Sequence, residues 1–151
     1  MPHQTVVILD FGGQYNQLIA RRVREQGVYC EVKPHTTPVA DLKALAPIGI
    51  IFTGGPGRVY DPAAPHADPE IFQLGVPVLG ICYGCQLLAH HLGGKVAAAQ
   101  SDSAREYGKT ETAFDTDCKL FRGLPAKSVT WMSHGDYMEK VPEGFRLTAR
   151  S

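Results

Sequence analysis

The stretch that decides the fold is Val76-Pro77-Val78-Leu79-Gly80-Ile81-Cys82-Tyr83-Gly84, which runs into the helix-forming residues 86–92. An apolar strand, a corner at one residue and a helix make a nucleophile elbow, here with cysteine at the corner. Such a corner is too tight for side chains two residues before and two after it, and both positions are glycine, Gly80 and Gly84. The free N–H groups and the dipole at the helix N-terminus favour a thiolate. Cys82 is therefore predicted to be a covalent nucleophile.

Three other interpretations of this cysteine compete with the nucleophile. A lone cysteine is usually a small buried hydrophobe, and Cys82-Tyr83-Gly84-Cys85 at a helix start also has the spacing of a thioredoxin-like redox pair. The redox interpretation explains neither Gly80 nor the glycine-rich loop upstream, and thioredoxins carry proline where this chain has Gly84. The third interpretation is a metal ligand, but the two remaining cysteines, at positions 30 and 118, form no second ligand pair, so no metal site is expected.

The composition agrees with one α/β domain inside the cell. A chain of 151 residues with 44% hydrophobic residues can bury a sizeable core, and we expect residues 1–151 to form a single domain. Fifteen basic and fifteen acidic residues cancel, which indicates neither a nucleic-acid surface nor a membrane surface. Four irregularly spaced cysteines, with no signal peptide and no long apolar run, predict a reducing, cytoplasmic setting.

Short apolar runs alternate with helical patterns, which predicts an open, mostly parallel sheet with helices on both faces. We expect strands at 5–9, 29–33, 48–53 and 76–79, helices at 15–26, 39–45 and 86–92, and a short helix ending near residue 75. The first helix should pack Leu18, Ile19 and Val23 against the sheet, and the proline-rich segment 62–69 should be a surface excursion. Further strands expected at 95–99, 108–114, 128–132 and 146–149 make the C-terminal third β-rich.

Three predicted loops at the carboxyl ends of the parallel strands carry unusual residues: 10–15, 53–57 and the cysteine elbow. Open α/β sheets bind ligands at this edge. Acyl transfer needs N–H donors aimed at the oxyanion, one from the residue after the nucleophile and one from a neighbouring strand-end loop. Tyr83 and Gly55 are predicted to supply them. The alternatives for the glycines are a tight turn or phosphate binding, but neither loop has a Walker pattern or a complete Gly-x-Gly-x-x-Gly.

Several segments between residue 5 and the last residue form one recognisable pattern. They are Ile8-Leu9-Asp10-Phe11-Gly12-Gly13-Gln14-Tyr15, residues 18–25 and 27–31, Gly54-Gly55-Pro56, Gly80-Ile81-Cys82-Tyr83-Gly84, Arg105-Glu106-Tyr107-Gly108 and Trp131-Met132-Ser133-His134-Gly135-Asp136. With these segments the chain resembles the class I glutamine amidotransferases and, within that family, the GMP synthetase branch. The cysteine elbow is typical of the whole family, and the first and last segments point to the branch.

The resemblance implies a flavodoxin-like fold and hydrolysis of glutamine to glutamate. The ammonia would pass to an ATP-pyrophosphatase synthetase domain or subunit that aminates ATP-activated xanthosine monophosphate (XMP) to GMP. No cofactor is implied for this domain; ATP and Mg²⁺ belong to the synthetase partner. Cys82 would be the nucleophile and Gly55 and Tyr83 the oxyanion donors. Glutamine would be held by Gln86, Ser133, His134, Gly135 and Asp136.

The chain departs from the family pattern at three places. Gly13 stands where the family often has serine, and Cys85 where it often has methionine. The family completes its triad with a His-Pro-Glu motif, which is absent here, so we expect a chain truncated before that segment and a weak or inactive enzyme by itself. His134 is the tempting substitute base. Histidines 90 and 91 should point away from the sulfur, and histidines 3, 35 and 66 should be solvated.

The missing motif keeps a second class of function open. A glutaminase-like module could sense glutamine or dock on a synthetase without hydrolysing anything. A His-Pro-Glu motif in the polypeptide after Ser151 would favour the enzyme.

Overall fold

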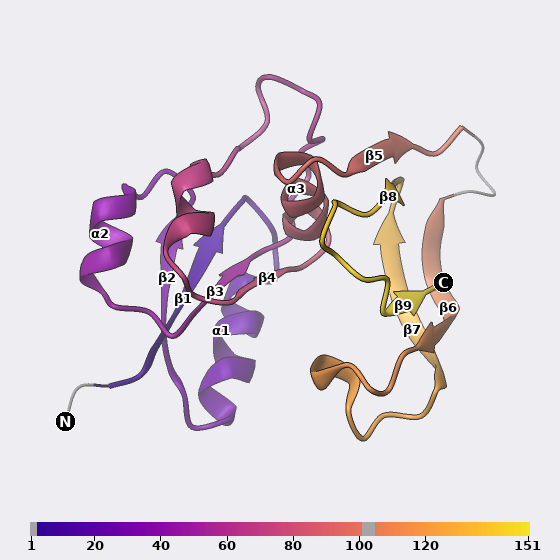
Figure 1. The fold of residues 1–151 in the computed structure, drawn as a ribbon, viewed down its shortest axis with the longest axis horizontal. Coiled ribbons are helices and arrows are strands. Elements are labelled where there is room, and N and C mark those ends of the chain that lie inside the picture. Colours follow the sequence, from indigo (N-terminus) through magenta and orange to yellow (C-terminus); the bar gives the residue numbers. More distant parts are fainter. Residues whose placement is uncertain (1–2, 101–104) are drawn as a thin grey trace. The chain divides into compact units, whose positions relative to one another are not determined.

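The computed structural model describes residues 3–100 and 105–151. They form two compact units, with the boundary in the sequence between His91 and Leu92 (Figure 1). The expectation of a single domain over residues 1–151 stays a prediction. Within the described residues, no helix is long and apolar enough to cross a membrane.

The first unit is built on a four-stranded parallel sheet in the order β2-β1-β3-β4. This confirms the predicted parallel sheet with helices around it. Its strands are β1 (Thr5–Asp10), β2 (Tyr29–Pro34), β3 (Gly49–Phe52) and β4 (Val78–Gly80). Its helices are α1 (Asn16–Glu25), α2 (Val39–Ala44) and α3 (Tyr83–His91), with a 3-10 turn, η1 (Pro69–Gln73), where the sequence predicted a short helix.

Strand β1 is the centre of the core. Val7, Ile8 and Leu9 are completely buried, because parallel strands covered on both faces carry a continuous apolar run instead of an alternating one. Side chains alternate between the faces. Ile8 packs on one face with Cys30 of β2 and Ala20 of α1. Because these strands pair in parallel, the carboxyl ends of β1, β3 and β4 lie at the same edge of the sheet.

The buried face of helix α1 agrees only in part with the predicted one. Ile19 and Val23 pack against the core as expected, but Leu18 is 53% exposed. Asn16 and Ala20 are buried instead, because residues at i, i+3, i+4 and i+7 share one helical face and that face begins at residue 16. Leucine at position 18 is apolar but lies outside this set.

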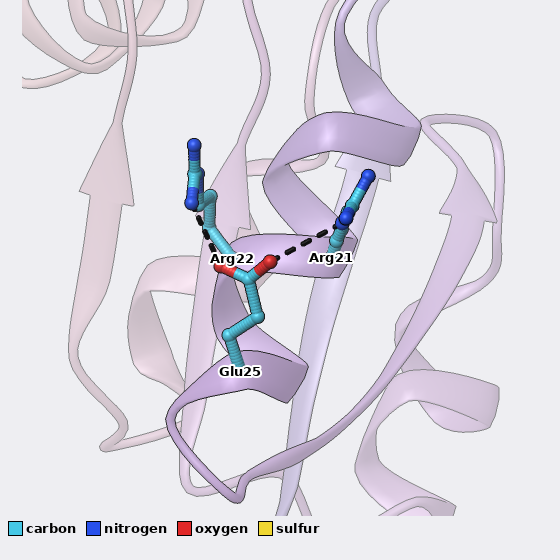
Figure 2. A network of polar contacts seen from close by, with 3 residues as sticks. All are labelled: Arg21, Arg22 and Glu25. Atoms are coloured by element: carbon cyan, nitrogen blue, oxygen red, sulfur yellow. Dashed lines mark hydrogen bonds and ion pairs between the residues drawn. The ribbon is translucent and has the colours of Figure 1, made fainter.

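The outer face of α1 carries a small ionic network (Figure 2). The Arg21 Nε and Arg22 Nη1 groups donate to the two carboxylate oxygens of Glu25 at 3.2 and 2.8 Å. Both arginines are largely exposed, and surface ion pairs of this spacing contribute only about 0.3–0.5 kcal/mol. The network marks the solvated face of the helix.

The second unit confirms the predicted β-rich C-terminal part. β5 (Lys95–Ala98) pairs antiparallel with β8 (Asp136–Lys140), and β6 (Glu106–Phe114) lies between β7 (Lys127–His134) and β9 (Ala149–Arg150), with a 3-10 turn, η3 (Lys119–Phe121), in the β6–β7 connection. Strand β8 was not predicted, because four of its five residues are exposed and leave no apolar alternation. The predicted strand at 146–149 is wrong except for Ala149. Only Ala149 and Arg150 have pairing partners, at the end of β6.

Candidate active site

Cys82 stands at the corner between β4 and α3. Its φ is +52°, one of two positive values among the described residues other than glycine, and its side chain is exposed. L-residues avoid this left-handed region, at a cost of about 1–2 kcal/mol, and such strain persists only where the surroundings enforce it. The backbone turn therefore has the geometry expected of a nucleophile elbow.

The two glycines of the elbow are required by space. A Cβ added at Gly80 would lie 2.6 Å from the Cα and N atoms of Cys85, and one added at Gly84 would lie 2.4 Å from the carbonyl oxygen of Phe52. Real Cβ atoms essentially never come that close to backbone. The first turn of α3 consequently packs directly on the ends of β3 and β4, as the sequence pattern predicted.

Main-chain hydrogen bonds hold the elbow against β3. The Ile81 N–H donates to the Phe52 carbonyl at 3.0 Å, and the Gly84 N–H lies 3.1 Å from the Thr53 carbonyl. The Gln86 N–H donates to the Cys82 carbonyl at 3.0 Å, which closes the first turn of α3. Because Tyr83 is the first residue of α3, its N–H has no acceptor within the helix.

The loop after β3 reaches the nucleophile position. A Cβ on Gly54 would be 3.4 Å from the Cβ of Cys82. The next glycine, Gly55, lies so close to the main chain of Phe11 that an added Cβ would be 2.3 Å from the Phe11 carbonyl oxygen. The structure thus brings the loops after β1 and β3 together with the elbow.

Two side chains of α3 behave differently from Cys82. Tyr83 is buried, and its hydroxyl donates to the Pro65 carbonyl; burial, and to a smaller extent Asp61, raises the pKa of Tyr83. Burial, followed by the neighbouring Cys82, raises the pKa of the Cys85 thiol. A thiol kept protonated in this way is a poor nucleophile, so Cys85 is not equivalent to Cys82.

The predicted substrate segment lies in the second unit, at the turn between β7 and β8. Ser133 and His134 end β7, Gly135 makes the turn, and Asp136 is buried at the start of β8. The register pairs Tyr107 with Ser133 and residue 106 with residue 134. Two motifs that are about 25 residues apart in sequence are therefore neighbours on β6 and β7.

His134 is held at both ring nitrogens. Its Nε2 lies 2.9 Å from a carboxylate oxygen of Glu106, and its Nδ1 lies 2.9 Å from the main-chain carbonyl of Asp136. Both partners are hydrogen-bond acceptors, so both ring nitrogens are engaged within the second unit. A ring nitrogen engaged in this way is poorly placed to take a proton from a thiol, so this arrangement does not suit a general base.

The two histidines of α3 lie at its C-terminal end. His90 and His91 are the last residues of the helix, about 12 Å along it from its start. His35 and His66, which the sequence predicts to be solvated, are half-buried. His35 follows β2 and stacks on Phe11, whose ring centroid lies 6.0 Å from that of Tyr83, and His66 packs against the rings of His90 and His91.

These features define a class of protein: a parallel α/β sheet whose strand-end edge carries a cysteine elbow beside a glycine-rich loop. The sequence profile named Glutamine amidotransferase class-I matches residues 7–151. The chain belongs to the class I glutamine amidotransferase family.

The chain is similar to much longer proteins. It is 58% identical over 149 residues to the GMP synthase [glutamine-hydrolyzing] of Caldicellulosiruptor saccharolyticus and 55% identical to that of Clostridium botulinum. Each alignment covers 99% of this chain but 29% of the relative. The chain therefore spans less than a third of the length of these relatives.

Solved structures share the fold. A candidate GMP synthase subunit from Thermoplasma acidophilum superposes with a TM-score of 0.78 at 29% identity, over 97% of this chain and 72% of that one. A Thermotoga maritima glutamine amidotransferase gives 0.67 at 21% identity, over 93% of this chain and 64% of that one.

Sequence reasoning assigned no role to two polar residues at these sites. Glu106 contributes to the family resemblance only as part of a motif, and its contact with His134 depends on strand register. Thr53 is the first residue of the glycine-rich loop, and it is completely buried. A hydroxyl residue that ends an apolar strand directly before two glycines is the signal that could have drawn attention to it.

Proposed function

We propose that this chain is the glutaminase part of a GMP-synthesising enzyme and that Cys82 attacks the side-chain amide of glutamine. The observation that carries the proposal is the strained, exposed Cys82 between two glycines that have no room for a side chain. Backbone strain at a side chain presented to solvent supports a functional role, and the family to which the chain belongs acts on glutamine.

The proposed reaction proceeds through a thioester. The thiolate of Cys82 forms a bond to the amide carbon, and the carbonyl π electrons move to oxygen, which becomes an oxyanion facing the N–H groups of Tyr83 and Gly55. The oxyanion collapses, the C–N bond breaks, and the nitrogen leaves as ammonia after taking the proton that the general base removed from the Cys82 thiol. Water then hydrolyses the thioester to glutamate and returns the thiol.

Two sets of substrate-binding residues are proposed, each within its own unit, as the family resemblance implies. In the first unit we propose Gln86, one helical turn after the nucleophile, and in the second unit Ser133, His134, Gly135 and Asp136. Because both ring nitrogens of His134 are engaged by acceptors, the residue suits a binding and orienting role better than proton abstraction. The general base would then come from a His-Pro-Glu segment of a longer polypeptide, as the family resemblance implies.

The relatives support a partner for the released ammonia. Their printed name is GMP synthase, and they are more than three times as long as this chain. We propose that an ATP-pyrophosphatase synthetase domain or subunit uses the ammonia to aminate XMP, and that this partner alone needs ATP and Mg²⁺. This proposal includes a cytoplasmic location, as the cysteine usage indicates.

A non-hydrolytic, glutamine-binding module is the second candidate. The observation in its favour is that both ring nitrogens of His134 are engaged by acceptors within the second unit. Such a module would bind glutamine without releasing ammonia.

The deciding experiment measures ammonia release by this chain beside a polypeptide extended past Ser151 through a His-Pro-Glu motif. We expect background release from the short chain and turnover from the extended one, because general acid–base help is worth about 10²–10⁴-fold. Cys82→Ser in the extended polypeptide should abolish turnover. His134→Asn, made in both the short chain and the extended polypeptide, tests whether His134 is the general base. Activity in the short chain that disappears with His134→Asn would make His134 the base. No turnover in the extended polypeptide despite glutamine binding would favour the binding module.

A further inference from the structure

Thr53, the residue that follows β3, is completely buried although its side chain is polar. Buried hydroxyls need hydrogen-bond partners, and the Thr53 hydroxyl has two. Its Oγ1 accepts the Phe11 N–H at 3.0 Å and donates to the Gly54 carbonyl at 3.0 Å. One side chain therefore joins the loop after β1 to the loop after β3.

The main chain of Thr53 makes two more connections. Its N–H donates to the Leu9 carbonyl of β1 at 3.2 Å, and its carbonyl accepts the Gly84 N–H of α3 at 3.1 Å. The loop after β1, the glycine-rich loop and the elbow helix thus meet at a single residue.

These contacts connect Thr53 to both proposed oxyanion donors, the N–H groups of Gly55 and Tyr83. Gly84 follows Tyr83 directly, and its N–H is shared between the carbonyls of Ile81 at 3.0 Å and Thr53 at 3.1 Å, so the Thr53 carbonyl helps to locate the Tyr83 N–H. The hydroxyl holds Phe11, whose carbonyl oxygen lies so close to Gly55 that no Cβ fits between them. A shift of Phe11 would be passed to Gly55 through this contact.

We infer that Thr53 is a positioning residue, whose hydroxyl sets the separation between the Gly55 and Tyr83 N–H groups. The inference rests on the proposed function, since an oxyanion hole matters only to acyl transfer. Thr53 is not a catalytic residue, because its hydroxyl is buried and both of its hydrogen bonds are to the main chain.

Thr53→Val tests this inference because valine keeps the branched shape and removes the hydroxyl. The change leaves the buried Phe11 N–H without an acceptor, and such a group seeks a new partner. Thr53→Ser restores the hydroxyl. Thr5→Val is the matched control, since Thr5 is also buried but lies at the opposite, amino end of β1.

The measurements are glutaminase kinetics in the extended polypeptide, iodoacetamide alkylation of Cys82, and deuterium exchange of the Phe11 amide. We expect Thr53→Val to lower kcat by about tenfold, less than the 10²–10³-fold of a lost oxyanion donor, with KM changing by no more than about threefold. Thr53→Ser and Thr5→Val should stay within about threefold of the parent. Alkylation, which needs no oxyanion hole, should not change.

Each outcome decides the inference. Faster exchange at Phe11 with the kcat loss of Thr53→Val and its rescue by serine would support it. Equal losses of kcat and alkylation, or no rescue by serine, would show that Thr53 serves only the fold and would overturn it. If the parent polypeptide releases no ammonia, the proposed function fails. The exchange measurement does not depend on turnover, so an unchanged exchange rate of the Phe11 amide in Thr53→Val would reject the positioning role by itself.

Discussion

Gly84 offers the sharpest test of the elbow, because it lies where α3 packs on the end of β3. An alanine Cβ at this position would be 2.4 Å from the Phe52 carbonyl oxygen and 2.6 Å from the Phe52 Cβ. That same carbonyl accepts the Ile81 N–H at 3.0 Å. Gly84→Ala must therefore move α3 away from β3 or disturb a hydrogen bond of the elbow.

The expected magnitude combines two opposing effects. Overpacking a well-packed site costs about 1–3 kcal/mol, and contacts with rigid backbone put this case in the upper part of that range. Replacing glycine by alanine in a helix returns up to about 1 kcal/mol. We expect a net loss of about 1–2 kcal/mol, which for a chain of this size lowers Tm by about 2–8 °C.

Thermal unfolding followed by circular dichroism measures the shift, and Gly49→Ala is the matched control. Gly49 is the first residue of β3, at the end opposite Phe52, and an added Cβ there would meet only the Pro77 carbonyl oxygen at 3.7 Å, an ordinary contact. Its Tm should stay the same or rise slightly. Iodoacetamide alkylation of Cys82 should be slower in Gly84→Ala and unchanged in Gly49→Ala. Equal Tm values for the two variants would refute the claim that the elbow has no space for a side chain.

Three further predictions concern the elbow and the histidine cluster. Cys82→Gly should be more stable than Cys82→Ala by about 1 kcal/mol, because glycine adopts the +52° φ without strain; equal denaturation midpoints would contradict this. Cys85→Ser should leave the alkylation rate of Cys82 and the glutaminase activity of the extended polypeptide mostly intact. Loss of activity in both Cys82→Ser and Cys85→Ser, together with a Cys82–Cys85 disulfide that forms readily, would restore the redox interpretation. Burial, followed by the neighbouring His66 and His90, lowers the pKa of His91. The contribution of His91 to the free energy of unfolding is therefore fully present above the unfolded pKa of about 6.5, and it is lost as the pH falls through the lower folded pKa. His91→Gln should therefore reduce the fall in Tm between about pH 7 and pH 5, while the exposed His3→Gln should not; identical pH profiles for His91→Gln and the parent would argue against it.

Local sequence determined the elements of the first unit well. Continuous apolar runs predicted the buried parallel strands, and Gly80 and Gly84 predicted the corner at Cys82, because a sharp turn excludes side chains at both flanking positions. The prediction was weaker where the pattern was ambiguous. Leu18 is apolar yet exposed, since the buried face of α1 is chosen by the sheet and not by the helix. β8 has almost no buried residue and exists because β5 pairs with it.

The contacts between segments that are distant in sequence were decided only by the tertiary structure. Nothing local to Thr53 reveals that its hydroxyl meets the Phe11 N–H 42 residues away, or that its carbonyl meets Gly84. The pairing of Glu106 with His134 likewise depends on the register of β6 and β7. Periodicity and glycine spacing are properties of a few consecutive residues, so the sequence by itself determined the elbow. Hydrogen-bond partners across strands are set by how the whole sheet assembles, and this is why the contact between Glu106 and His134 and the hydrogen bonds of Thr53 could be recognised only in the folded chain.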